Sequence, residues 1–211
     1  GATRKFSNRD FFFGYRDSVF KTPKGKDLVI TRVALRLSKA RKPNLEYKDL
    51  KERFKIYYSR LRRSGFGGQV GFKKEDITLA DIRKAVLEIR SRKFPDLKQY
   101  GTAGSFFKNP VISQAQFDAL REKFPALPGF KLKVNGQKLM VKLPLAWILD
   151  NICDLKGFQK GNVALFEHQP IVLINTGGAT AEEITDFAEE IAVRVKERTG
   201  IQIQREVIHI S

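Results

Sequence analysis

The 211-residue chain has one cysteine, two histidines and few means of building a metal or disulfide framework. Cys153 alone excludes an internal disulfide and a cysteine metal cluster. With His168 and His209 as the histidines, we expect no zinc site and no other metal. No run of 18 or more apolar residues occurs, so no membrane span is predicted, and the start of the chain lacks the apolar segment of a secretory signal. We therefore expect a protein of a reducing cytoplasm.

Positive charge is abundant and unevenly spread. The formal net charge is +17, and residues 1–100 hold 27 Lys/Arg against 11 Asp/Glu, whereas residues 101–211 hold 13 against 12. A basic half indicates an anionic partner, such as nucleic acid, a membrane surface or a phosphorylated ligand. The alternative is an ordinary solvated surface. Apolar residues make up 42% of the chain, enough for a packed core.

Hydrophobic patterns predict helices and strands in mixed order. Helices are expected at 47–63, from Thr78 to just before Pro95, and at 113–124, 145–153 and 180–199. Strands are expected at 28–37, 170–175 and 201–210, with a hairpin at 130–141 around Asn135-Gly136. Four glycines in 64–71 predict a mobile loop. Because no βαβ unit repeats, the order indicates an α+β fold.

The stretch Y-G-T-A-G-S-F-F-K-N-P, 100–110, has neither a helix nor a strand period. It is not a phosphate-binding P-loop, since G-K-[ST] is absent, and it lacks the G-x-S-x-G of a nucleophile elbow. Its backbone N–H groups could face an anion. Ser105 is therefore either a functional hydroxyl or a turn serine that bonds its own backbone.

Three other positions could carry chemistry. Arg16 in G-Y-R-D-S could bind a carboxylate through its bidentate fork, or pair with Asp17. The cations of R-S-R-K, 90–93, end a predicted helix, where they favour its dipole and also suit a diphosphate. In the predicted final strand, alternation places Glu206 on the face opposite Ile203 and Val207, so its side chain points to a groove or to solvent.

Taken together, these segments resemble the UDP-N-acetylenolpyruvoylglucosamine reductases, flavoenzymes of bacterial peptidoglycan synthesis. The similarity follows the family's order over nearly the whole chain. The motifs that show the similarity are F-F-F-G-Y-R-D-S-V-F-K (11–21), Y-K-D-L (47–50), I-R-S-R-K-F-P-D (89–96), A-G-S-F-F-K-N-P (103–110), A-W-I-L-D (146–150), L-K-G-F-Q (155–159), I-V-L-I-N (171–175), G-A-T-A-E-E-I (178–184) and R-E-V (205–207).

The resemblance implies a reaction and three catalytic residues. In the family, NADPH first reduces FAD. The reduced flavin then delivers a hydride to C3 of the enolpyruvyl group, and a proton reaches C2. The serine of A-G-S-F-F-K-N-P is the family's proton donor, which here corresponds to Ser105. Arg16 and Glu206 match the residues that polarise the carboxylate and stabilise the enolate.

The resemblance also implies binding residues for a UDP-sugar and for FAD. Lys93 would meet the diphosphate, and Tyr47 corresponds to a tyrosine of a mobile lid. Further substrate contacts are implied at Tyr15, Asn109 and Gln159. Cofactor contacts are implied at Arg90 and Gly104.

The family's N-terminal flavin-binding region precedes G-Y-R-D, and most of it has no counterpart in this sequence. The resemblance therefore implies the remnant of a vanillyl-alcohol-oxidase/PCMH-like flavin domain at 1–97, with lid and linker. An α+β substrate-binding domain at 98–200 and a returning final strand at 201–211 would follow. Such a chain would be an inactive or partial form of a cytoplasmic bacterial monomer, with no nucleic acid or membrane partner. The alternative is a non-catalytic basic module for nucleic acid or a protein partner.

Overall fold

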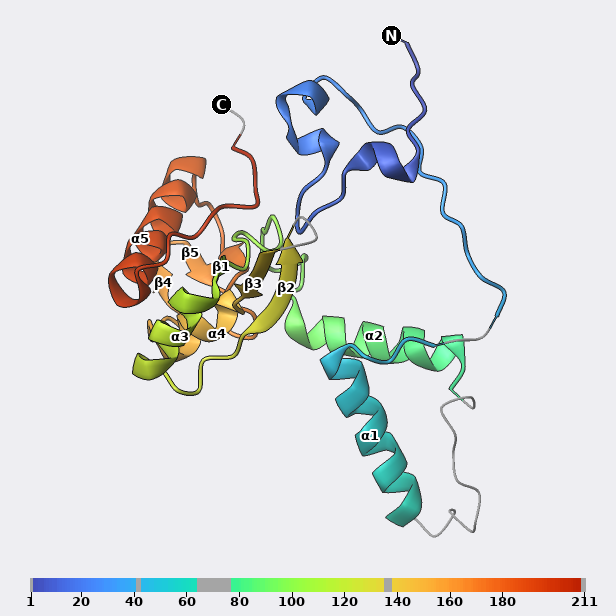
Figure 1. Cartoon of the computed structure of the whole chain (residues 1–211). Helices are drawn as coiled ribbons and strands as arrows, with labels where there is room; N and C mark the ends of the chain where they lie inside the picture. The colour runs from blue at the N-terminus through green and yellow to red at the C-terminus, as the bar shows by residue number, and fades with distance from the viewer. Residues whose placement is uncertain (1, 41–42, 64–76, 135–137, 210–211) are drawn as a thin grey trace. The chain divides into compact units, whose positions relative to one another are not determined.

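The structure is a computed structural model that describes residues 2–40, 43–63, 77–134 and 138–209 (Figure 1). It divides into two compact units. The first unit comprises Gly1–Leu35, Ser105–Leu155 and Thr185–Ser211, and the second comprises Arg36–Gly104 and Lys156–Ile184. Helices and strands both occur, as an α+β fold requires.

An antiparallel sheet forms part of the first unit. Strand β1 (Val111–Ser113) pairs with β3 (Lys138–Lys142), which pairs in turn with β2 (Phe130–Val134). The β2–β3 pair confirms the predicted hairpin, although its turn, 135–137, lies outside the described residues. Ser113 ends β1 and caps α3 (Gln114–Lys123), because its hydroxyl accepts from the Gln116 backbone.

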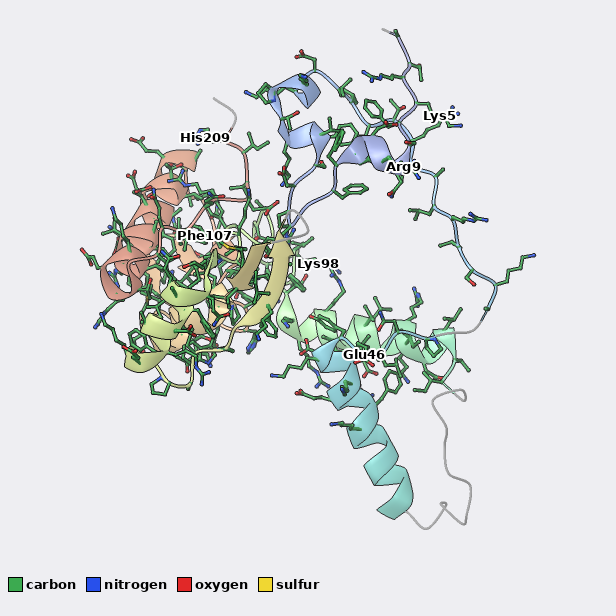
Figure 2. All side chains as sticks on the ribbon, in the orientation of Figure 1. Lys5, Arg9, Glu46, Lys98, Phe107 and His209 are labelled. Atoms are coloured by element: carbon green, nitrogen blue, oxygen red, sulfur yellow. The ribbon has the colours of Figure 1, made fainter. Side chains whose placement is uncertain are left out.

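Two helices contribute buried side chains to the core of this unit. Helix α4 (Leu145–Asn151) is short and apolar, and α5 (Ala181–Thr199) is long and amphipathic. Fully buried side chains come from α4, α5 and the segments beside them: Val141, Leu143, Leu145, Ile148, Leu149, Leu155, Phe187, Ile191 and Val195. Phe107, labelled in Figure 2, is only 2% exposed. The core therefore anchors the segment that directly follows Ser105.

The N-terminal segment of the first unit is held by aromatic contacts and short 3-10 helices. These helices are η1 (Asn8–Phe11), η2 (Val19–Lys21) and η3 (Pro23–Gly25). The Phe6 ring lies 5.7 Å from Phe20 and 6.1 Å from Phe11, measured between centroids. A side chain at Gly25 would meet the Val19 carbonyl oxygen at 2.2 Å, so this turn requires glycine.

The second unit contains a helix pair and a second small sheet. Helix α1 (Lys48–Arg63) and α2 (Leu79–Lys93) share a core of Leu50, Phe54, Ile77 and Ala85. Thr78 caps α2 through a capping box with Asp81, so this helix begins where it was expected. The sheet is antiparallel, in the order β4 (Gln159–Lys160), β5 (Val163–Leu165) and β6 (Leu173–Asn175).

Most predicted elements are present, but two predicted strands are not. Residues 28–37 are extended yet form no strand among the described residues, and Val29 is 85% exposed. A strand needs a hydrogen-bonding neighbour, and this segment has none in the described chain. No strand is formed within 201–209, and the predicted final strand is reduced there to an isolated bridge between Arg205 and Phe107 with one backbone hydrogen bond on each side of it. The predicted loop 64–71 lies outside the described residues.

Candidate functional site

A tight turn presents Tyr15 and Arg16 in the first unit. The Gly14 N–H donates to the Asp17 carbonyl at 3.0 Å, which closes the turn. Arg16 has a φ of 53°, in the left-handed region that a non-glycine residue seldom adopts. Such backbone strain often accompanies a functional position. The turn therefore directs Arg16 at some cost in local energy.

Glu206 lies against Arg16 and a second cation, Lys21. Lys21 Nζ donates to Glu206 Oε1 at 2.8 Å, and Arg16 Nε lies 3.9 Å from Glu206 Oε2. Oε2 is buried and has no hydrogen-bond partner among the described residues. Glu206 was predicted as a catalytic residue and Lys21 was not, although Lys21 ends the quoted motif G-Y-R-D-S-V-F-K.

These cations set the ionisation of Glu206. Burial by itself raises the pKa of this carboxyl, because it disfavours the charged form. The Lys21 hydrogen bond and charge, with weaker contributions from Arg16 and Lys108, outweigh burial and lower the pKa overall. Glu206 is therefore an anion at neutral pH.

Backbone pairing brings the segment after Ser105 alongside Glu206. The Glu206 N–H donates to the Phe106 carbonyl at 2.7 Å, and the Lys108 N–H donates to the Gln204 carbonyl at 2.9 Å. Ser105 directly precedes Phe106 and is half-buried. The predicted catalytic residues Arg16, Ser105 and Glu206 thus fall in one unit, on three segments of it. The segments of Ser105 and Glu206 are paired through the backbone, and Arg16 approaches Glu206 through its side chain.

The two predicted substrate residues of this unit have structural partners. Asn109 Oδ1 accepts from the Leu145 N–H at 2.8 Å and so satisfies the first turn of α4. The Tyr15 ring lies under Lys142 Nζ, 5.1 Å from the ring centroid. The side-chain oxygen of Asn109 is therefore already hydrogen-bonded, and its side-chain NH₂ is the group that a ligand could use.

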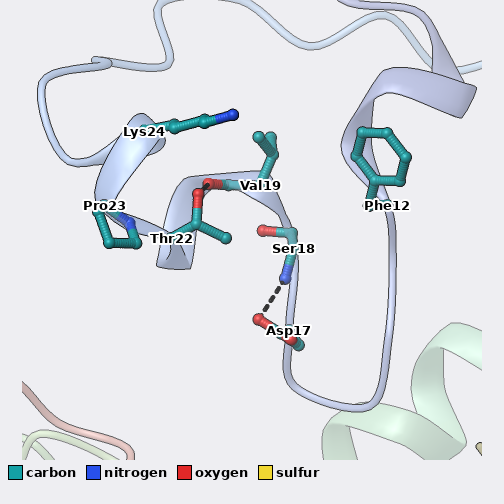
Figure 3. A pocket seen from close by; sticks show the side chains of 7 residues that line it. All are labelled: Phe12, Asp17, Ser18, Val19, Thr22, Pro23 and Lys24. Atoms are coloured by element: carbon teal, nitrogen blue, oxygen red, sulfur yellow. Dashed lines mark hydrogen bonds between the residues drawn. The ribbon is translucent and has the colours of Figure 1, made fainter.

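A hollow of about 450 Å³ lies beside the Arg16 turn (Figure 3). Two of its lining residues share a local bond, in which Asp17 Oδ1 accepts from the Ser18 N–H at 2.9 Å. The lining residues are Phe12, Asp17, Ser18, Val19, Thr22, Pro23 and Lys24. All belong to the N-terminal segment, and none is a predicted site residue.

In the second unit, Lys93 and Tyr47 meet at the ends of two helices. Lys93 Nζ lies 3.5 Å from Tyr47 Oη and 2.9 Å from Asp49 Oδ2. Tyr47 directly precedes α1, and Lys93 is the last residue of α2. Asp49 was not predicted as a site residue, although it stands in the quoted Y-K-D-L.

The other predicted residues of the second unit are more separate. Arg90 is exposed and stacks on Phe94, with 4.8 Å from its guanidinium carbon to the ring centroid. Gln159 is exposed and donates to the Gly161 carbonyl at 2.9 Å. Gly104 has a φ of 81°, and a Cβ there would meet no atom within 4 Å. The structure thus joins Tyr47 to Lys93, but not Arg90, Gln159 or Gly104 to that pair.

Two classes of site have no support in the described ranges. Across 2–40, 43–63, 77–134 and 138–209, no group of three or more His, Cys, Asp or Glu could hold a metal ion. None of the helices in these ranges is long and apolar enough to cross a membrane.

Sequence comparisons define the class to which this site belongs. Residues 96–210 match the sequence model of a domain family described as "UDP-N-acetylenolpyruvoylglucosamine reductase, C-terminal domain". The matched region contains Ser105, Asn109, Gln159 and Glu206.

Individual relatives extend the similarity to the whole chain. The chain is 35% identical over 207 residues to UDP-N-acetylenolpyruvoylglucosamine reductase of Photobacterium profundum, covering 98% of this chain and 53% of the relative. The Pasteurella multocida reductase is 36% identical over 203 residues, covering 96% and 52%. The Porphyromonas gingivalis reductase is 36% identical over 212 residues, covering 100% and 56%. The chain belongs to the UDP-N-acetylenolpyruvoylglucosamine reductase family, and it spans about half the length of these curated relatives.

Proposed function

We propose that this chain supplies the substrate-binding and proton-donating half of an FAD- and NADPH-dependent reductase. The overall reaction reduces UDP-N-acetylglucosamine enolpyruvate to UDP-N-acetylmuramate. The observation that carries the proposal is the Arg16–Glu206–Lys21 cluster, whose Glu206 lies on a segment paired with the one that follows Ser105. The alternative of a basic module for nucleic acid or a protein partner gains no support from the reductase relatives.

The bound flavin would supply a hydride to C3 of the enolpyruvyl group. The chain's own residues then have to stabilise the negative charge that develops on the substrate and supply one proton. The Arg16 guanidinium suits the substrate carboxylate, because it offers two parallel N–H donors. The Ser105 hydroxyl delivers the proton to C2. A serine is a weak acid, so it needs a polar network that stabilises the charge developing on the substrate.

Glu206 orders the cations around this charge. It is itself anionic and is bonded to Lys21, so it cannot act as the proton donor in this protonation state. It instead holds Arg16 and Lys21 in place through its two carboxylate oxygens. This arrangement keeps positive charge ready before the substrate arrives, which is the kind of preorganisation that lowers barriers.

The second unit would bind the nucleotide portion of the substrate. Lys93 suits a diphosphate, and Tyr47 beside it suits the role of a lid residue. Gln159 offers an amide group for the sugar and nucleotide, and Asn109, which belongs to the first unit, offers another. The basic surplus of residues 1–100 fits an anionic substrate and cofactor.

The described residues fit FAD only in part. Gly104 leaves open space on one side of the backbone directly before Ser105, which suits a flat ring. The exposed Arg90 guanidinium suits a cofactor phosphate. In addition, apolar side chains at 29–35 are exposed, as expected if residues 1–97 are part of a flavin domain completed by other polypeptide. We propose that the chain alone binds FAD weakly or not at all, has no reductase activity and is a monomer of the bacterial cytoplasm.

Two measurements test this function. The purified chain should show no stoichiometric flavin absorbance after incubation with FAD, and a stoichiometric flavin spectrum would contradict the weak-binding proposal. Calorimetry with UDP-N-acetylglucosamine should show binding by the wild type and weaker binding by Lys93→Met. No heat at millimolar ligand would contradict the proposal that this half suffices to bind the nucleotide.

A further inference from the structure

Lys93, the residue proposed to meet the diphosphate, is already paired with an anion of this chain. Its Nζ donates to Asp49 Oδ2 at 2.9 Å, and the two side chains are 30% and 28% exposed. Burial disfavours the charged ammonium, yet the pKa of Lys93 is raised overall by Asp49 and Tyr47. Asp49 therefore already neutralises the positive charge with which a phosphate would form an ion pair.

The Asp49–Lys93 pair is not required to hold the two helices together. Helices α1 and α2 share a buried apolar core, around which Leu45, Ile82, Val86 and Ile89 also pack. A second ion pair, Arg53 Nη2 to Glu88 Oε2 at 2.8 Å, joins the same helices. Partly exposed ion pairs add little to stability beside such a core. The stability of the helix pair therefore does not account for the contact between Asp49 and Lys93.

A carboxylate oxygen and a phosphate oxygen compete for the same donors. The ammonium group of Lys93 has three N–H donors, and the structure directs one to Asp49 and one toward Tyr47 Oη. A phosphate that binds this ammonium also comes close to the Asp49 carboxylate, and two anions repel each other at that distance. Diphosphate binding therefore requires Asp49 to move or to give up part of its bond.

Asp49 has an alternative partner when it leaves Lys93. It is the second residue of α1, where the first-turn N–H groups lack partners inside the helix and carry partial positive charge. A carboxylate at this position stabilises the helix without help from Lys93. The side chain can thus exchange one favourable environment for another.

We infer that Asp49 is a competing anion that masks Lys93 in the free protein and is displaced by the diphosphate of the substrate. The inference rests on the proposed function, because Lys93 is taken as the diphosphate-binding residue. It assigns to Asp49 an effect that acts through Lys93 and lowers the affinity of the site for the diphosphate. If Asp49 only held Lys93 in position, it would strengthen ligand binding. If it competes with the ligand for Lys93, it weakens binding.

Calorimetric titration of the chain with UDP at fixed ionic strength tests the sign of the effect. Asp49→Asn keeps the shape of the side chain and removes its charge, so UDP should bind roughly threefold to fivefold more tightly. In the Lys93→Met background the same substitution should have less than half of this effect, since the residue acts through Lys93. The matched control is Glu52→Gln, which removes a carboxylate one turn along α1 that faces Lys48 instead, at 4.0 Å.

The outcomes separate the inference from the proposed function. If Lys93→Met weakens UDP binding but Asp49→Asn leaves it unchanged or weaker, the inference is overturned and the diphosphate role of Lys93 stands. If Glu52→Gln tightens binding as much as Asp49→Asn, a general charge effect replaces the specific one and the inference is overturned as well. If neither the wild type nor Asp49→Asn binds UDP, both the inference and the nucleotide-binding role of this chain fail. Binding by Asp49→Asn where the wild type is silent supports both.

Discussion

Lys21 and Glu206 are separated by 185 positions in the sequence, yet their side chains form a 2.8 Å hydrogen-bonded ion pair. The pair joins the N-terminal aromatic segment to the chain that follows α5, both in the first unit. It also brings a second cation to the carboxylate that Arg16 approaches. The site thus contains one anion between two cations.

Replacement of Lys21 should make Glu206 easier to protonate. The pKa of Glu206 is lowered in the folded state, so the ionised form stabilises the fold above the carboxyl's unfolded pKa. That contribution is lost as the pH falls through the lowered, folded pKa. Lys21→Met should therefore cost about 1 kcal/mol at neutral pH, and the cost should shrink as the solution is acidified.

Urea unfolding of the wild type and of Lys21→Met between neutral and acid pH measures this difference. Lys24→Met is the control, because it removes a lysine of the same segment that does not bond Glu206. A loss of stability in Lys21→Met that is equally large in acid would contradict the role given to the ion pair.

Asn109 should have a structural effect that is separate from any effect on a ligand. Its Oδ1 accepts from the Leu145 N–H, and Leu145 is fully buried. Asn109→Ala leaves that donor without its partner and should destabilise the first unit by about 1–3 kcal/mol. Asn109→Asp keeps the acceptor and should cost less. Chemical denaturation compares them, with Asn151→Ala as a control whose exposed amide bonds Trp147.

Gly104 should resist substitution for conformational reasons alone. A methyl group there would meet no atom within 4 Å, but the φ of 81° is unfavourable for any other residue. Gly104→Ala should therefore cost about 1–2 kcal/mol without any clash. The melting temperature compared with that of Gly101→Ala, at a glycine of ordinary φ in the same loop, measures it. Equal shifts for the two variants would argue against conformational strain as the cause.

The exposed apolar segment should accept charge without loss of stability. Val33 and Leu35 are 73% and 77% exposed, so lysine at either position buries no charge. Val33→Lys and Leu35→Lys should leave the unfolding transition within about 0.5 kcal/mol. Chemical denaturation of the two variants and the wild type measures this. Ile112→Lys, at a buried strand position, should instead unfold the protein.

Ser105 should matter for one half of the catalytic cycle only. In a flavin-loaded reductase that carries this segment, Ser105→Ala should lower kcat by about 10²–10⁴. Flavin reduction by NADPH should keep its rate, while oxidation of the flavin by the enolpyruvyl substrate slows. Stopped-flow absorbance separates the two steps. Ser91→Ala, on the exposed face of α2, is the control, and slowing of both half-reactions would show a general defect.

Local patterns predicted the helices well, because the signals lie within the helices themselves. Thr78 with Asp81 and Thr180 with Glu183 mark helix starts by their own hydrogen bonds. Predicted strands did worse, because alternation describes one strand and says nothing of its neighbour. Within the described residues, 201–209 pairs only briefly with 106–108, and 28–37 pairs with no strand. Without a neighbour, an extended segment stays extended and forms no sheet.

The sequence by itself determined the family and most candidate residues, because the motifs around Arg16, Lys93, Ser105 and Glu206 are short and in family order. It also contained Lys21 and Asp49, but nothing in the sequence singled them out. Only the tertiary structure decided that Lys21 bonds Glu206 and that Asp49 bonds Lys93. The physical reason is that ion pairs form between side chains brought together by folding, over 185 and 44 positions here, and no local pattern encodes such a distance.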